Sequence, residues 1–429
     1  MKLLLTILAF NLMIIIHELG HFLVAKYFNV NVKEFSLFVG PKIFSKKFGE
    51  TIYSLRTLPI AAYVKMEGEE EQSESDRSYN SKTVWQRGLI ILAGPLANIL
   101  SAVIAIAIFY SLTGVNTLKV STVEKGGPAE IAGIQVGDNL IEYAGKSTYT
   151  QDDFLIYTNI KPGIDADIKV ERGDKILPLQ IKPISEFKDF IIGAGFKDSN
   201  NAKIESLGDN LPAKTAGLLV GDVITQIDDK KIKTFEELKK AVNEKNGDVI
   251  TVIISRNGVE RPAIEIKPIE RSYKGAYTGL TFSKEEATPL SVMKYSILFA
   301  YSNTKNVPYT IKSLFTGDVK INQLMGPVGI VASINSAVSQ SIDYTEILIN
   351  LLGIFALISV AIGATNLVPF PALDGSKIVL LILEGIRRKP IPVEKEAAIS
   401  MVGIAVLMIF AIFVTYADVN RVLTGFFKP

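Results

Sequence analysis

The sequence predicts a multi-pass α-helical membrane protein with two small β domains inserted between its second and third spans. Two observations lead to this fold class, a set of four long apolar runs and one internal repeat. The 429-residue chain is 48% hydrophobic, and its mean hydropathy is +0.29. Such a chain is too apolar for an ordinary soluble protein of modest charge, so a membrane protein with soluble parts is favoured.

Four apolar runs are each close to the roughly 20 residues that a helix needs to cross hydrocarbon. We expect four transmembrane helices, and the third segment includes the loop that follows its helix. The first run has an alternative as a signal peptide, because Lys2 precedes it, but no small-residue cleavage site ends it. The four predicted segments are 1–27, 87–114, 345–385 and 396–420.

Cationic residues in the short loops predict the orientation of these helices. Lysines and one arginine follow the first run, and Arg387, Arg388 and Lys389 precede the fourth. These loops are predicted to be cytoplasmic, which puts both termini and residues 113–343 outside the cytoplasm. The formal net charge of +2 indicates no nucleic-acid partner. The chain has no cysteine, which excludes disulfides and thiolate metal ligands.

An internal repeat fills the segment between the second and third runs. Five pairs of identical residues are each separated by 84 positions, which indicates a tandem duplication. Each copy contains alternating strand patterns, such as Ala166–Val170 and Val249–Ile254. The five pairs are Pro128 and Pro212, Gly133 and Gly217, Asp138 and Asp222, Arg172 and Arg256, and Gly195 and Gly279.

The two copies resemble bacterial PDZ domains, which bind extended peptides by strand addition. The resemblance lies in the matching stretches at 126–138 and 210–222, each of which ends in Val-Gly-Asp. We expect the first PDZ-like domain at 118–197 and the second at 202–281, both extracytoplasmic. The stretch at 193–196, Gly-Ala-Gly-Phe, resembles a PDZ carboxylate-binding loop, and a plain turn is its alternative.

A His-Glu-x-x-His motif at His17, Glu18 and His21 lies inside the first apolar run. Residues four apart share one face of a helix, so both imidazoles can reach one ion while Glu18 acts on a water. No other histidine occurs in the chain. The alternative is a chance motif at a helix end, but ionisable residues at membrane depth are costly and are by default functional.

A hydrolytic zinc site needs a third protein ligand and one open position, and Asp374 is the best candidate for that ligand. It follows Pro369 and Pro371, which break helical hydrogen bonding at membrane depth. Irregular backbone there is tolerated only beside protein or a water-filled cavity, so we expect these prolines to border the substrate site. Asp374 could instead cap the next helix. Glu384 and Glu346 are rival acids at helix ends.

These motifs occur in an order that resembles the site-2 protease family, in particular its bacterial regulator-of-sigma-E-type members. The resemblance rests on the His-Glu-x-x-His, on Gly-Pro-Leu-Ala-Asn at 94–98, on Leu-Asp-Gly at 373–375 and on the PDZ pair. It implies that zinc is bound by His17, His21 and Asp374 and that Glu18 is the general base. It further implies that Asn98 and Asn366 contact the scissile peptide, for which helix–helix bonding is the alternative.

The resemblance also implies the biology of the protein. The expected activity is regulated intramembrane proteolysis of single-span proteins, such as an anti-sigma factor or remnant signal peptides, in a bacterial inner membrane. The PDZ pair would filter substrates by size, so that only substrates trimmed by another protease enter. Two alternatives remain, a non-proteolytic PDZ-bearing scaffold or metal carrier, and an iron site with the same ligand set.

Two further regions are predicted to associate with membrane lipids. Residues 28–86 hold strand patterns on either side of Pro59, and the family places a membrane-associated β sheet here. Ala61 and Ala62 replace the two glycines that the family usually has, which leaves the local backbone geometry open, and Ser376 replaces another glycine. Residues 283–340 are weakly amphipathic and are predicted to lie on the outer membrane surface.

Overall fold

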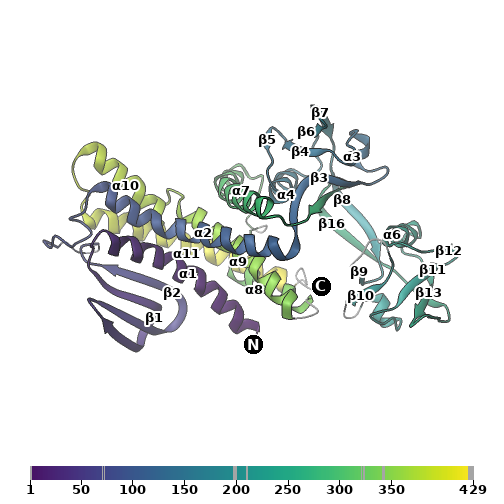
Figure 1. The fold of residues 1–429 in the computed structure, drawn as a ribbon, viewed down its shortest axis with the longest axis horizontal. Helices are drawn as coiled ribbons and strands as arrows, with labels where there is room; N and C mark the ends of the chain where they lie inside the picture. The colour runs from purple at the N-terminus through teal and green to yellow at the C-terminus, as the bar shows by residue number, and fades with distance from the viewer. Residues whose placement is uncertain are drawn as a thin grey trace.

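The computed structural model describes residues 2–69, 71, 73–196, 201–208, 211–319, 321, 324–340 and 344–423. The molecule is elongated, with long helices and a β hairpin at one end and two β domains at the other (Figure 1). Helix α7 lies between these two ends (Figure 1). The chain therefore forms a helical region and a region of β domains that lie apart from each other (Figure 1).

The helical region contains five main helices. Within the described residues, α2, α9 and α11 are long and apolar enough to cross a membrane, whereas α1 is not among the helices that meet this criterion. The three apolar helices correspond to the second, third and fourth predicted runs. The bounds are α1 Lys2–Tyr27, α2 Val84–Thr113, α9 Tyr344–Asn366, α10 Asp374–Arg387 and α11 Val393–Leu423.

Small residues bring α1, α2 and α9 close together. A Cβ on Gly20 of α1 would lie 2.3 Å from the Ala93 carbonyl oxygen of α2. A Cβ on Gly363 of α9 would lie 2.7 Å from the carbonyl oxygen of Pro95, also in α2. Glycine at such contacts lets helix backbones approach where larger side chains would separate them. Helix α2 is thus the central helix against which α1 and α9 pack.

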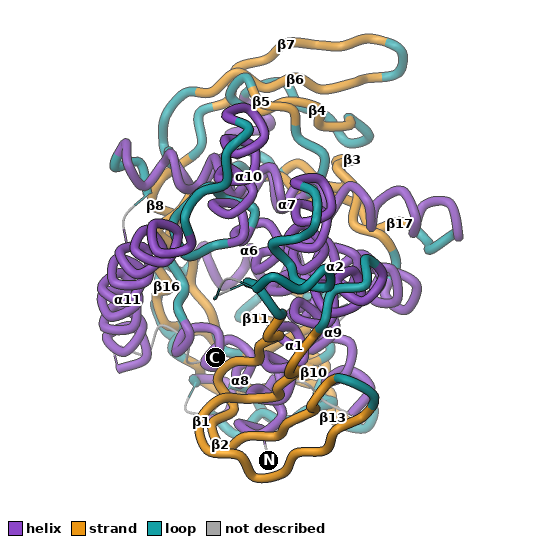
Figure 2. The backbone as a smooth tube through the Cα atoms, turned by 90° about the vertical axis from the view of Figure 1, so that its left-hand side faces the viewer, coloured by secondary structure: helices purple, strands orange, loops and turns teal. Residues whose placement is uncertain are grey.

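A two-stranded sheet of β1 (Val32–Phe48) and β2 (Thr51–Met66) lies against helix α1 (Figure 2). Both strands fold back, so that Phe35 of β1 pairs with Tyr53 and also with Val64 of β2. Strand β2 runs without interruption through Pro59, Ala61 and Ala62, and neither alanine has a positive φ. Alanine is therefore accommodated where the sequence left the geometry open.

The first β domain is built on a six-stranded sheet and the second on a five-stranded sheet, and each has its own apolar core. A two-stranded ribbon of β8 and β16 connects them. The first domain contains β3 Val115–Val123, α3 Pro128–Ile131, β4 Asn139–Tyr143, β5 Lys146–Ser147, α4 Gln151–Ile160, β6 Ala166–Arg172 and β7 Lys175–Ile181. Then follow β8 Ile184–Ile191, β9 Ala194–Phe196, β10 Ile204–Leu207, α5 Pro212–Thr215, β11 Val223–Ile227, β12 Lys230–Lys231, α6 Phe235–Glu244, β13 Ile250–Arg256, β14 Val259–Glu260, β15 Ile264–Ile266, β16 Ile269–Tyr277 and β17 Leu280–Glu285.

The second domain is inserted into the first, which differs from the predicted limits of 118–197 and 202–281. Strand β17 pairs with β3 of the first domain, and β9 pairs with β10 of the second. Leu280 and Phe282 pack on the core of the first domain, while Ala194 and Phe196 pack on that of the second. Each strand lies in the domain whose core its apolar side chains complete, so strands that are close in sequence belong to different domains.

The duplication is visible in a buried ion pair that both copies contain. Arg172 Nε donates to Asp138 Oδ1 at 2.7 Å, and Arg256 Nε donates to Asp222 Oδ1 at 2.8 Å. Both aspartates are almost fully buried. In each copy the arginine also donates to a glycine carbonyl, of Gly133 or of Gly217. The 84-residue offset therefore preserves a three-dimensional contact as well as a sequence pattern.

Helices α7 (Pro289–Thr316) and α8 (Pro327–Gln340) occupy the region predicted as an amphipathic surface segment. One part of α7 packs through Phe299 and Ala300 against α2 and α9, and another part contacts helix α4 of the first β domain. Asp418 of α11 accepts hydrogen bonds from the N–H groups of Gly326 and Gly329 at 3.0 and 2.7 Å. These bonds satisfy free donors at the start of α8.

Candidate metal centre

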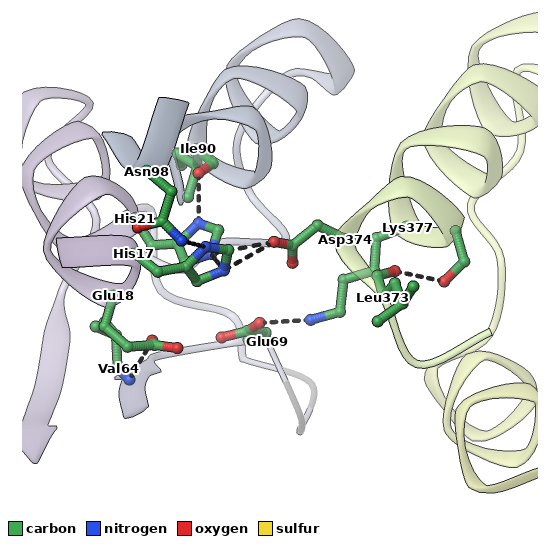
Figure 3. A network of polar contacts seen from close by, with 11 residues as sticks. His17, Glu18, His21, Val64, Glu69, Ile90, Asn98, Leu373, Asp374 and Lys377 are labelled. Carbon is green, nitrogen blue, oxygen red and sulfur yellow. Dashed lines mark hydrogen bonds and ion pairs between the residues drawn. The ribbon is translucent and has the colours of Figure 1, made fainter. Parts of the chain in front are cut away.

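Helix α1 presents His17 and His21 on one side, where they meet Asp374 at the start of α10 (Figure 3). The two Nε2 atoms lie 3.2 Å apart. Asp374 Oδ2 lies 3.0 Å from Nε2 of His17 and 3.5 Å from Nε2 of His21. In the part of the chain that the structure describes, these are the residues that could hold a metal ion together.

The loop before α10 directs Asp374 towards α1. Ala372 has a φ of +79°, a region that residues with a side chain rarely adopt. A Cβ on Gly375 would lie 2.3 Å from the carbonyl oxygen of Val368, so the chain can fold back only with glycine here. Leu373 is the N-cap of α10 and forms no side-chain cap, and Asp374 Oδ2 faces the histidines. The capping alternative therefore has no support in this geometry.

The rival acids lie elsewhere. Glu384 forms an ion pair with Arg87 of α2, and Arg87 Nη1 donates to its Oε2 at 3.2 Å. Glu346 lies in the first turn of α9 and outside the group of three metal-capable residues. Neither acid contributes to the cluster around the histidines.

The three donor atoms fit a tetrahedral ion. Zinc bound to nitrogen and oxygen at about 2.0–2.1 Å has ligand–ligand distances of about 3.3–3.4 Å, close to the sides of the observed triangle. His21 Nδ1 lies 2.8 Å from the Ile90 carbonyl oxygen, which can only accept. Nδ1 therefore carries the proton, and Nε2 keeps its lone pair for a metal.

Gly94 of α2 keeps the space beside the histidines free. A Cβ at this position would lie 2.3 Å from His21 Nε2 and 2.9 Å from His17 Nε2. Any side chain would intrude on the ligand atoms themselves. The donor set, the proton position on His21 and this glycine together fit a zinc ion held by two histidines and one aspartate.

Asn98 of α2 lies behind His17 and not in the cavity. Its Nδ2 is 3.5 Å from His17 Nδ1, and its Oδ1 is buried without a hydrogen-bond partner. Exchanging the amide oxygen and nitrogen, which have nearly the same shape, would let Oδ1 accept a hydrogen bond from the Nδ1–H of His17. Asn98 then supports His17 in the way that the Ile90 carbonyl supports His21.

A cavity of about 400 Å³ opens beside the metal ligands. Asn366 lines it, whereas Pro369 and Pro371 are not among its lining residues. The Pro371 backbone instead packs on α11, where a Cβ on Gly403 would lie 2.2 Å from its carbonyl oxygen. Pro371 therefore packs against α11, and Asn366 is the predicted substrate residue that lines the cavity.

Glu18 also lines this cavity, at the edge of strand β2. Its Oε2 accepts a hydrogen bond from the Val64 backbone N–H at 3.1 Å (Figure 3). The carboxylate thus lies next to the three metal-capable residues and is held by a backbone group of the sheet.

Comparison with known proteins identifies the family. The profile of peptidase family M50 matches residues 5–410. The chain belongs to peptidase family M50. The zinc metalloprotease RasP of Oceanobacillus iheyensis is 30% identical over 440 residues, which cover 97% of this chain and 98% of that protein. RasP of Shouchella clausii is 29% identical over 444 residues, with 97% and 98% covered.

This M50 peptidase is a membrane zinc metalloprotease of the site-2 type, which confirms the predicted family, enzyme class and cofactor. The alternatives of a non-proteolytic scaffold or metal carrier, and of an iron site, are set aside by this membership.

Sequence reasoning missed several residues of the M50 site. Lys377 lines the cavity, and its Nζ lies 2.9 Å from Glu69 Oε1 across the cavity wall. Lys377 follows Asp374 by three residues, so helical spacing alone could have placed it near the site. Glu69, the Val64 N–H and the Ile90 carbonyl carry no comparable signal, because they come close to the site only through tertiary packing.

Proposed function

We propose that this M50 peptidase hydrolyses peptide bonds within the transmembrane segments of single-span membrane proteins. One observation carries the proposal. The three metal-capable side chains meet where apolar helices pack together, with Asp374 reaching the histidines from the irregular segment that follows helix α9. A site at this depth suits a substrate that is itself embedded in the membrane.

The geometry of the site supports a role for each residue. When bound, zinc supplies Lewis acidity for hydrolysis. His17, His21 and Asp374 would hold it, and the cavity borders these three residues. Glu18 takes a proton from the attacking water and returns it to the leaving nitrogen. Its position beside the ligands, without being one of them, supports this role.

The substrate is proposed to bind as an extended strand. Residues 62–66 of β2 pair with β1, and Tyr63, Val64 and Met66 of this segment line the cavity. An unwound transmembrane helix has free peptide groups, which an exposed strand edge can satisfy. Asn366 on the same cavity offers a side-chain amide to the substrate backbone.

The proposed membrane topology has four spans, with α1 as the first, in a bacterial inner membrane. The cationic loops near Lys26 and Arg387 would be cytoplasmic, and the β domains extracytoplasmic. The two β domains, which we interpret as PDZ-like, would act as a size filter for substrates that another protease has trimmed. Their position at the far end from the β1–β2 hairpin supports control of entry and not participation in bond cleavage (Figure 1).

A pair of variants tests the proposed chemistry. Glu18→Gln should retain zinc and lose cleavage by a factor of at least about 100, because the ligands survive and only the base is lost. Asp374→Asn should lose both zinc and cleavage, because a neutral amide is a poor zinc ligand. Cleavage of a single-span substrate and metal content of the purified protein are the two measurements. Near-normal cleavage by Glu18→Gln would contradict the proposal.

A further inference from the structure

The contact between Glu18 and strand β2 is the starting point. Val64 pairs with Phe35 of β1 through the sheet, yet its N–H points to Glu18 Oε2 at 3.1 Å. This N–H is therefore on the side of β2 that faces α1 and the cavity. A backbone N–H that donates to a carboxylate forms a charge-assisted bond, which is stronger and more directional than a neutral one.

A second contact fixes the strand against the same helix. Asn11 Nδ2 of α1 donates to the Pro59 carbonyl oxygen of β2 at 2.8 Å. Asn11 and Glu18 are seven residues apart, which puts them two turns apart on one face of the helix. Ile14 lies on that face between them and lines the cavity. Strand β2 is thus tied to α1 at two points, and one of these points is the base itself.

We propose that the Val64 N–H is the positioning group for Glu18, so that β2 aims the general base at the reacting water. This inference rests on the proposed role of Glu18 as the base. A glutamate has three side-chain torsions, and a bond to Oε2 fixes them while Oε1 stays available for a proton. The β1–β2 sheet then positions the general base, in addition to offering its edge strand to the substrate.

The chain places this support on a rigid element. Val64 lies within a 16-residue strand, and strand pairing on both sides of position 64 fixes the direction of its N–H. A one-residue shift of β2 would turn that N–H to the opposite side and leave Glu18 without its donor. The register of the hairpin is therefore coupled to the geometry of catalysis.

Removing the single N–H tests the proposal. Val64→Pro lacks this donor, and proline is tolerated where a strand N–H does not take part in the sheet. Replacing Val64 by its α-hydroxy acid removes the same N–H with almost no steric change. An α-hydroxy acid at Leu55, which lies in β2 but does not line the cavity, is the matched control for the loss of one strand N–H.

For the α-hydroxy acid at Val64 we expect kcat to fall about 10- to 100-fold, with KM changed less than about twofold and zinc content unchanged. The Leu55 control should keep kcat within about threefold of the unmodified protein. In a Glu18→Asp background, whose shorter side chain no longer reaches Val64, the same replacement should have almost no further effect.

Other outcomes would overturn the inference. A raised KM with normal kcat would mean that the N–H docks the substrate. A raised kcat would mean that the contact restrains Glu18 and that substrate binding releases it. Equal losses in both backgrounds would indicate a merely structural role. Full activity of Glu18→Gln would instead refute the proposed function itself, so the two failures are distinguishable.

Discussion

The two β domains are copies of one sequence, yet the structure gives them different surroundings. Both keep the buried pair of aspartate and arginine, Asp138 with Arg172 and Asp222 with Arg256. Helix α4 of the first copy packs on α7, which in turn packs on α2 and α9. The second copy connects to the first through the ribbon of β8 and β16. One copy is thus fixed to the helices, and the other extends from it.

The difference is concentrated in one helix of each copy. Asp153 in α4 and Glu237 in α6 occupy equivalent positions, and each accepts a backbone N–H at the start of its helix. Asp153 is fully buried and also accepts from Asn306 Nδ2 of α7 at 2.6 Å, whereas Glu237 is exposed. The first domain is therefore docked on α7 through the buried Asp153, whereas the equivalent Glu237 of the second domain makes no such contact in the described part of the chain and is exposed to solvent.

The largest expected effect comes from excising the second copy. The second domain is inserted into the first, so it can be removed without breaking the first domain. Ile184 and Tyr277 pair across the ribbon of β8 and β16 and can be joined by an Asn-Gly turn. Deletion of 202–281 would instead remove the start of β17, including Leu280, from the first domain. If the second copy filters by size, the excised protein should cleave a single-span substrate that still carries its outer domain. Cleavage of the intact and the trimmed substrate is the measurement.

The zinc content of the excised protein is the control for folding. A zinc-loaded variant that loses cleavage of trimmed substrate would mean that the second copy docks substrate. Unchanged rejection of the intact form would assign the filter to the first copy, which stays attached to α7.

A smaller effect is expected from truncating the two equivalent capping acids. Asp153→Ala should destabilise the first domain by on the order of 3 kcal/mol, because it leaves the Asn306 amide and the Lys305 ammonium without their buried partner. Glu237→Ala should cost the second domain under about 1 kcal/mol, the value of an exposed helix cap. Hydrogen exchange in residues 146–172 and 230–256 measures both. Equal losses would contradict the docking interpretation.

The smallest effect is a pH dependence that the two copies should share. Burial raises the pKa of Asp138, but Arg172 and the Gln135 N–H outweigh it, so the pKa lies below its ordinary value. Arg256 lowers the pKa of Asp222 in the same direction. A depressed pKa contributes stability that is complete above the ordinary value of about 3.9 and is lost as the pH falls through the lowered one.

Hydrogen exchange between about pH 5 and pH 2 should therefore show both domains losing protection together. Asp138→Asn should flatten the dependence in the first copy alone. A dependence seen in one copy and absent from the other would show that the shared ion pair does not control acid stability.

The sequence predicted the elements that depend on local spacing. Two histidines four residues apart share one face of a helix, whatever the position of that helix in the fold. The 84-residue repeat can likewise be read from the sequence without knowing how the two copies are arranged. Asp374 was the expected third ligand because its segment is irregular at membrane depth, and the structure brings it to the histidines. The prolines of that segment were expected in the substrate site, and neither of them lines the cavity beside the histidines.

The sequence by itself determined the membership in peptidase family M50, the metal-binding spacing on α1 and the duplication. Only the tertiary structure decided that β17 returns to the first domain, that the Ile90 carbonyl fixes the proton on His21 and that Val64 holds Glu18. The contacts of Glu18 and His21 join residues 46 and 69 positions apart through backbone groups. Every residue carries such groups, so they leave no signature in the sequence, and only packing selects which of them meet.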